Sequence, residues 1–262
     1  MIVKVNKKLI SKFIEAENSR QYYAGINDYT NLMKLYKSKL PDIKNNNVSN
    51  KWDLMNNIAK FDASNPMAED RTNIVANIID YNNKKILNIG FGPLNLENKL
   101  YNNFNHGIWE GIDISRKSVS KANSKYPNFK FTVGSIINYP LKKASYDIVL
   151  ALEVLEHISY RDIFAVLRKV NSSLVKNGLF IVSVPLNEKL DEMIYKGANP
   201  NAHLRIYSRD LIKAELTISQ FKVIKEIQLS AFNKYYYIKK IIKTLIPRIF
   251  ESNNLILVCQ KS

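Results

Sequence analysis

The sequence predicts an α/β fold with a doubly wound, mostly parallel sheet. Three observations lead to this expectation. From Lys84 onward, short apolar segments alternate with stretches of helical periodicity, as in repeated βα units. The first apolar segment runs into a glycine turn, Gly90-Phe91-Gly92, and the second ends at an acidic residue, Asp113. Ligands of open α/β sheets bind where such turns and strand ends meet, so the pattern also predicts where a site lies.

The expected strands are short runs rich in Ile, Val, Leu and Phe, separated by turn residues and helical patterns. They cover residues 86–89, 108–112, 129–133, 146–152, 178–184, 221–229 and 254–260.

Helices are expected where apolar residues recur at intervals of three or four. Such patterns fall in residues 74–79, 117–125, 163–170, 208–216 and 235–249. The first 70 residues are expected to be helical and irregular, and the polar run at 45–50 predicts a loop.

Composition excludes several classes of protein. The chain has 262 residues, of which 46% are hydrophobic, so it can form a sizeable core and global disorder is not expected. No apolar run approaches the roughly 20 residues that a membrane span needs, and residues 1–8 do not resemble a secretory signal. The single cysteine, Cys259, excludes an internal disulfide and a Cys-rich metal site. We therefore expect a cytoplasmic protein.

The chain is strongly basic, with a formal net charge of +16. This charge attracts nucleic acid, anionic lipid or anionic substrates, although lysines spread over the chain also serve solubility. Two concentrations stand out, one in the first fifty residues and one at 234–248, which contains no acid.

Five segments of the sequence resemble the class I S-adenosylmethionine-dependent methyltransferases. The resemblance covers residues 84–261, and the longest match, 145–158, resembles the small-molecule branch of that family. The matching segments are 86–93, 111–115, 131–136, 145–158 and 177–185. The resemblance implies a Rossmann-like sheet of seven strands with a C-terminal antiparallel hairpin. A NAD-dependent dehydrogenase, the obvious competitor, expects a three-glycine turn that this chain lacks.

The resemblance implies S-adenosyl-L-methionine as cofactor. Asp113 is expected to accept the ribose hydroxyls, although as an alternative it could cap a helix. Ser135 and Ile136 are expected at the adenine, and Arg71 at the carboxylate of the cofactor. The full cofactor-binding set is Arg71, Asn88, Gly90, Phe91, Gly92, Asp113, Ile114, Ser135, Ile136 and Leu152.

Three positions in or next to the matching segments depart from the family's pattern. Asn88 stands where an aspartate is usual, Leu94 where a third glycine is usual, and Ser135 where an aspartate is usual. These departures leave open a protein that keeps the fold without catalysis.

A second set of residues predicts the chemistry. His157 follows the fourth strand and is a candidate general base, or alternatively a brace for its loop. Carboxylate and imidazole groups can hold a divalent metal ion, or alternatively form salt bridges and helix caps. The candidate ligands are Glu153, Glu156, His157 and His203. A similar set occurs in ubiquinone-type O-methyltransferases and in small-RNA 3′-end 2′-O-methyltransferases, and 52–54 and 65–67 also resemble the ubiquinone type.

Two parts of the chain are expected to lie outside the common sheet. Residues 1–75 are expected to form a helical extension that caps the acceptor, and residues 76–262 the cofactor-binding domain, with insertions at about 186–207 and 232–252. In the second insertion, 235–249 predicts a basic amphipathic helix that caps the site or contacts an anionic membrane.

The sequence thus favours a methyltransferase, with O-methylation of a small-molecule, lipid-linked or glycan-linked acceptor. Two alternatives stay open, an RNA 2′-O-methyltransferase and a non-catalytic binding protein. The oligomeric state is not predicted.

Overall fold

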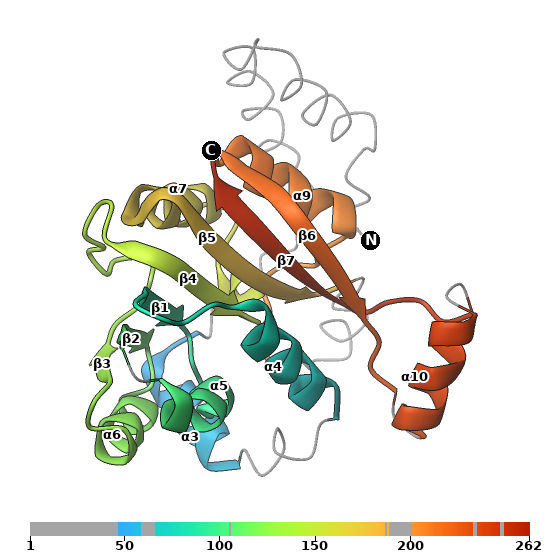
Figure 1. The fold of residues 1–262 in the computed structure, drawn as a ribbon, viewed down its shortest axis with the longest axis horizontal. Helices are drawn as coiled ribbons and strands as arrows, with labels where there is room; N and C mark the ends of the chain where they lie inside the picture. Colours follow the sequence, from blue (N-terminus) through green and yellow to red (C-terminus); the bar gives the residue numbers. More distant parts are fainter. Residues whose placement is uncertain are drawn as a thin grey trace.

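A seven-stranded sheet forms the centre of the molecule (Figure 1). The computed structural model describes residues 47–58, 66–104, 106–186, 188, 201–232, 235–246 and 249–262. The strand order is β3-β2-β1-β4-β5-β7-β6. The strands are β1 Lys85–Ile89, β2 Ile108–Asp113, β3 Lys130–Val133, β4 Tyr146–Leu152, β5 Leu174–Pro185, β6 Phe221–Leu229 and β7 Asn254–Lys261.

Strands β1 to β5 run parallel, and β7 lies antiparallel between β5 and β6. This arrangement confirms the predicted Rossmann-like sheet and its C-terminal antiparallel hairpin. The one clear difference is β5, which begins at Leu174, earlier than the expected segment at 178–184.

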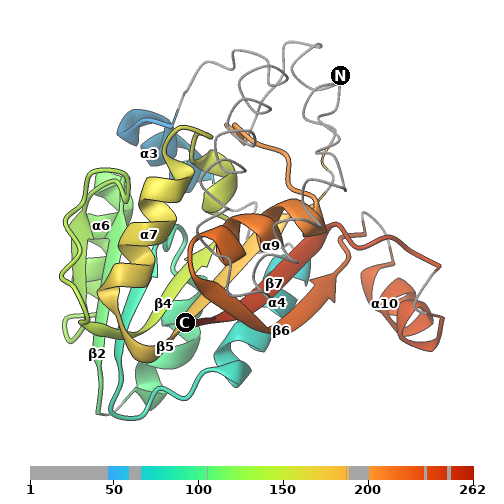
Figure 2. The same cartoon turned by 90° about the horizontal axis from the view of Figure 1, so that it is seen from above.

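Helices cover both faces of the sheet (Figures 1 and 2). Apolar residues of α7 and α9 pack on one face, and those of α4, α5 and α6 on the other. The described α-helices are α3 Ser49–Ile58, α4 Pro66–Ile78, α5 Asn95–Leu100, α6 Arg116–Lys125, α7 Ile163–Ser173, α9 Arg209–Ile218 and α10 Tyr236–Leu245. Two short 3₁₀ helices, η3 Tyr101–Asn103 and η4 Leu155–His157, lie between them. None of these described helices has the length and apolarity that a membrane crossing requires.

Serine side chains fix the start of two of the helices. Ser115 Oγ accepts a hydrogen bond from the backbone N–H of Ser118, and Ser208 Oγ accepts one from Leu211. These bonds satisfy amide donors that have no partner within the first turn of a helix.

The site follows from the register of three neighbouring strands. Ile89, the last residue of β1, pairs with Ile112 of β2 on one side and with Ala151 of β4 on the other. The turns that follow these strands therefore lie together at one edge of the sheet, where the strand order reverses.

The N-terminal extension is described only in part. Residues 1–46 and 59–65 lie outside the described residues, and with them most of the helical extension expected at 1–75. The predicted loop at 45–50 is too long, because α3 already begins at Ser49.

Candidate functional site

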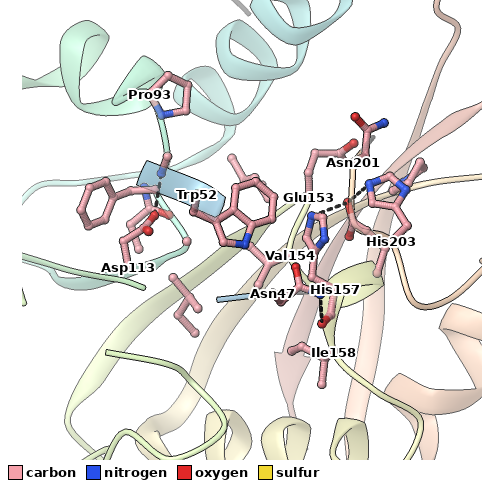
Figure 3. Close-up of a pocket in the computed structure, with 18 of the residues that line it drawn as sticks. Asn47, Trp52, Pro93, Asp113, Glu153, Val154, His157, Ile158, Asn201 and His203 are labelled. Atoms are coloured by element: carbon pink, nitrogen blue, oxygen red, sulfur yellow. Dashed lines mark hydrogen bonds and ion pairs between the residues drawn. The ribbon is translucent and has the colours of Figure 1, made fainter. Parts of the chain in front are cut away.

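A cavity of about 1000 Å³ lies at the carboxyl ends of β1, β2 and β4. Figure 3 shows Asp113 at one end of it, His157 and His203 at the other, and Trp52 between them. Every residue that the sequence predicts for cofactor, metal or catalysis lines this cavity: Arg71, Asn88, Gly90, Phe91, Gly92, Asp113, Ile114, Ser135, Ile136, Leu152, Glu153, Glu156, His157 and His203.

The glycine turn depends on backbone angles that favour glycine. Gly90 and Gly92 have φ values of 64° and 52°, in the left-handed region. A Cβ on Gly90 would lie 2.7 Å from a methyl group of Val154, so this position has no room for a side chain. At Gly92 the nearest atom to a Cβ would be 4.0 Å away. The turn therefore packs closely against the loop after β4 on one side and leaves room beside Gly92.

Asp113 connects the end of β2 to the glycine turn. Its Oδ2 accepts a hydrogen bond of 3.0 Å from Gly92 N–H, and its Oδ1 accepts one of 2.8 Å from Ser115 N–H. Burial raises the pKa of this carboxyl, while the two backbone bonds favour the ionised form. Each carboxylate oxygen keeps a second lone pair for a ligand.

The loop after β3 is closed by a lysine that the sequence reasoning missed. Lys169 Nζ, on α7, donates to the carbonyl oxygens of Ile136, Ile137 and Tyr139 at 2.9, 2.8 and 3.2 Å. Ser135 Oγ accepts a hydrogen bond from Ile137 N–H. The expected adenine contacts, Ser135 and Ile136, thus lie on a loop held to the neighbouring helix.

Glu153 is the centre of a polar network at the end of β4. Its carboxylate lies 3.3 Å from the Arg71 guanidinium and accepts hydrogen bonds from Asn254 Nδ2 at 3.0 and 2.9 Å and from Ser183 Oγ at 2.7 Å. These contacts join α4, β4, β5 and β7. They also hold Arg71 at the wall of the cavity.

Glu156, His157 and His203 form a separate cluster. One ligand atom from each residue lies within 4.8 Å of the others, and Glu156 Oε1 is 4.0 Å from the Nε2 atom of each histidine. Glu156 is completely buried, and among the described residues neither of its carboxylate oxygens has a hydrogen-bond partner. Burial, together with the charge of Glu153, raises its pKa well above the usual value. Glu153 itself does not belong to the cluster.

Both histidines are oriented through the nitrogen that faces away from Glu156. His203 Nδ1 lies 2.5 Å from Glu188 Oε2, and His157 Nδ1 lies 3.4 Å from the carbonyl oxygen of Ala202. When these Nδ1 atoms carry the proton, each Nε2 presents a lone pair. Burial, and the neighbouring His203, lower the pKa of His157 to about 3, which keeps its ring neutral.

Helix α3 and the residues just before it lie across the cavity. Asn47 Nδ2 donates to the carbonyl oxygens of His157 and Ala202, at 3.3 and 3.0 Å. The Trp52 ring meets the His157 ring edge-on, with 4.9 Å between the centroids.

The middle of α3 is tied to the start of α6. Asp53 Oδ1 accepts hydrogen bonds from Ser115 Oγ at 2.6 Å and from Lys117 N–H at 3.1 Å. The sequence marks residues 52–54 only through the family resemblance and predicts no role for Asn47, because no local pattern indicates either contact.

Comparisons with known proteins agree with this architecture. Residues 86–178 match the family model described as a methyltransferase domain, whereas no curated protein matches the chain. Residues 86–178 thus resemble a methyltransferase domain, and the sheet has the fold of solved S-adenosylmethionine-dependent methyltransferases. This result confirms the expected methyltransferase, but it does not distinguish the ubiquinone-type branch from others.

Solved structures similar to this methyltransferase domain show the fold. A protein in the complex of the Haloferax volcanii Trm112 methyltransferase activator and the putative methyltransferase aligns with a TM-score of 0.65 and 14% identity, over 81% of this chain and 96% of that one. An S-adenosylmethionine-dependent methyltransferase from Mesorhizobium loti aligns with a TM-score of 0.56 and 14% identity, over 74% and 98%. The cyclase SpnF has a TM-score of 0.56 and 16% identity, over 74% and 81%.

The methyltransferase domain accommodates Asn88 through a carboxylate that the sequence reasoning missed. Asn88 Nδ2 donates to Glu97 Oε1 at 2.7 Å, and Trp109 Nε1 donates to the same oxygen at 3.2 Å. Glu97 is completely buried, and this burial raises its pKa to about 7. An aspartate at position 88 would place two carboxyl groups in contact, so the amide is the compatible side chain.

Leu94 is accommodated by packing. It takes a φ of 68° immediately before α5, where a residue with a side chain is strained by roughly 1–2 kcal/mol. Its side chain is 1% exposed, and complete burial of a leucine contributes about 2 kcal/mol. The two effects are of similar size, so the methyltransferase domain keeps the turn without a third glycine.

Proposed function

We propose that the protein transfers the methyl group of S-adenosylmethionine to an oxygen atom of an acceptor bound beside Glu156, His157 and His203. One observation carries this proposal. A single cavity contains both the glycine turn with Asp113 and a cluster of groups of the kind that bind metal ions, Glu156, His157 and His203. The first set suits the cofactor and the second suits an acceptor hydroxyl.

The residues at the first end fit the cofactor. Gly92 leaves room beside the turn, and Asp113 keeps lone pairs for the two ribose hydroxyls. Arg71, at the cavity wall, can bind a carboxylate in addition to Glu153. When bound, the cofactor supplies a methyl group on a positively charged sulfur, which passes to the acceptor in one displacement.

The residues at the second end fit a divalent metal ion. A buried carboxylate without hydrogen-bond partners and two imidazoles with their Nε2 atoms toward it form a typical ligand set. Glu156, His157 and His203 would hold the ion, which would lower the pKa of an acceptor hydroxyl. The proposed set omits Glu153, whose carboxylate binds Arg71 and Asn254.

His157 suits the role of ligand better than that of general base. A base works best when its pKa lies near the working pH, and the pKa of His157 is lowered to about 3. The same shift keeps Nε2 unprotonated and available to a cation. Trp52 and Asn47 hold the ring and the backbone of His157 in place.

The acceptor class is proposed as a small-molecule, lipid-linked or glycan-linked hydroxyl compound. The alternative acceptor is a ribose 2′-hydroxyl of RNA, favoured by the net charge of +16 and by the cluster itself. RNA binding by this route weakens steeply as salt rises. Weak RNA binding that does not change with salt concentration would count against the RNA alternative.

A second candidate function is a non-methylating protein that keeps the fold, as the likeness to a cyclase illustrates. The departures Asn88, Leu94 and Ser135 first suggested it, but Asn88 has a compatible hydrogen-bond partner and Leu94 is packed in the core. The contacts around them therefore favour cofactor binding.

Titration calorimetry with S-adenosylmethionine tests the proposal. We expect binding in the micromolar range, and separate binding of Mn²⁺ that a His157→Ala/His203→Ala variant loses. Labelled-methyl transfer to a lipid extract, to hydroxyl-bearing small molecules and to RNA then separates the acceptor classes. Absence of cofactor binding at high micromolar concentration would overturn the proposed methyltransferase activity. Cofactor binding without Mn²⁺ binding would overturn only the proposed metal site.

A further inference from the structure

Helix α10 presents a continuous apolar face to solvent. Tyr237, Ile238, Ile241 and Leu245 lie on one side of the helix, and their exposed fractions are 61%, 59%, 61% and 76%. Single exposed apolar residues are common on protein surfaces, but a row of them along one helix face marks a surface that binds something. Figures 1 and 2 show α10 standing apart from the helices that cover the sheet.

The opposite face of α10 is attached to the rest of the protein by polar contacts. Tyr236 is buried, and its hydroxyl donates to Asp70 Oδ2 at 2.7 Å. Lys240 pairs with the same carboxylate, and Lys243 Nζ donates to Ser252 Oγ at 2.7 Å. These contacts fix the orientation of the helix, so the apolar face points away from the body.

The charge and the aromatic residues of this segment indicate what binds there. Residues 234–248 contain five basic residues and no acidic one: Lys234, Lys239, Lys240, Lys243 and Arg248. Tyr235 and Tyr237 are 72% and 61% exposed at the start of the helix. An apolar helix face with exposed tyrosines at its start, in a segment whose charges are all positive, suits an anionic membrane surface. A second copy of the chain, with a net charge of +16, would instead bring like charges together.

The segment that carries α10 begins and ends at the wall of the cavity. Ala231 and Asn253, which flank this segment, both line the cavity. Asp70, which holds α10, is next to Arg71 in the cavity wall. The helix is therefore connected to the site through the residues on either side of it and through Asp70.

We propose that α10 binds an anionic membrane surface, with Tyr237, Ile238, Ile241 and Leu245 among the lipid headgroups, and that the positive charge of residues 234–248 strengthens this binding. The proposal concerns a surface and does not depend on methyl transfer. Its failure and a failure of cofactor binding are therefore separate results.

Vesicle co-sedimentation tests this binding with the full chain. We expect wild-type protein to bind vesicles of phosphatidylcholine and phosphatidylglycerol, and to bind pure phosphatidylcholine at least tenfold more weakly. An Ile241→Glu/Leu245→Glu variant should lose binding to the mixed vesicles at least tenfold. Ile108→Glu, a matched control at an isoleucine that is 54% exposed on β2, should bind as wild type does.

A second variant separates charge from apolar contact. Lys239→Gln should weaken binding to anionic vesicles about fivefold and leave binding to neutral ones unchanged. Equal binding by wild type and the double variant, or no binding by wild type, overturns the proposal. So does a dimer in light scattering that Ile241→Glu/Leu245→Glu converts to a monomer, because the apolar face would then bind a second copy.

Discussion

A completely buried glutamate lies near each end of the cavity, and the two glutamates differ in their hydrogen-bond partners. Behind the glycine turn, Glu97 Oε1 accepts hydrogen bonds from Asn88 and Trp109. Beside the histidines, neither oxygen of Glu156 has a partner among the described residues. Burial raises the pKa of both carboxyl groups. Burial and the raised pKa are therefore shared, and the difference lies in the partners: one oxygen of Glu97 is hydrogen-bonded to the scaffold, whereas neither oxygen of Glu156 is, which suits its proposed role as a metal ligand.

The largest expected effect is at Glu156. Glu156→Gln keeps the shape but removes the charge, so we expect the methyl-transfer rate to fall about 1000-fold, or about 4 kcal/mol, as expected for a lost metal ligand. The affinity for Mn²⁺ should fall in parallel. Labelled-methyl transfer and calorimetry measure the two quantities.

The same position gives a control of opposite sign. Glu156→Met removes the unpartnered carboxylate, and we expect the metal-free protein to gain roughly 1–3 kcal/mol in its free energy of unfolding. A loss of stability in urea unfolding would instead mean that Glu156 serves the scaffold, and the contrast with Glu97 would disappear.

The second effect is a pH dependence at Glu97. Its pKa rises from the usual 4.5 to about 7 on folding, so ionisation opposes folding. Stability is unaffected below pH 4.5, declines between pH 4.5 and 7, and is lowered by about 3 kcal/mol above that range. Glu97→Gln removes this decline, so its advantage over wild type should grow between pH 5 and pH 8. Urea unfolding at the two pH values checks this, and an equal difference at both contradicts the assignment.

The third effect is expected at Asp113, whose carboxylate is proposed to bind the cofactor. Asp113→Ala should weaken S-adenosylmethionine binding about 100-fold, because charge-assisted hydrogen bonds contribute about 1.5–3 kcal/mol each. His157→Ala should change cofactor binding much less. Calorimetry on the two variants compares the ends of the cavity directly, and the reverse order would contradict the roles assigned to them.

The smallest effect is expected at Glu188, which contacts the proposed metal ligand His203. Glu188→Gln weakens the acceptor that orients His203 Nδ1, so Mn²⁺ affinity should fall about tenfold with no change in cofactor affinity. Glu226→Gln is a suitable control, because Glu226 pairs with Arg209 and Lys213 and does not line the cavity. An unchanged Mn²⁺ affinity in Glu188→Gln would mean that His203 needs no second partner.

Local patterns in the sequence predicted most of the fold and part of the cavity lining. Strand periodicity, the glycine turn and the residues at strand ends are encoded within short segments, so 86–93 and 145–158 were informative by themselves. Glu97, Lys169 and Asn47 were missed because their roles depend on partners that only the folded chain brings near. Periodicity likewise predicted the amphipathic α10, but only the contacts of Tyr236 show that its apolar face points outward.

The position of α3 has a consequence for how ligands bind. Residues 47–58, which include α3, contact the end proposed for the cofactor through Asp53 and Ser115, and the end proposed for the acceptor through Asn47 and the backbone of His157. A ligand that displaces α3 at one end alters the contacts at the other. By thermodynamic reciprocity, each ligand then changes the affinity for the other by the same factor. Cofactor and acceptor are thus expected to bind cooperatively, with α3 as the coupling element.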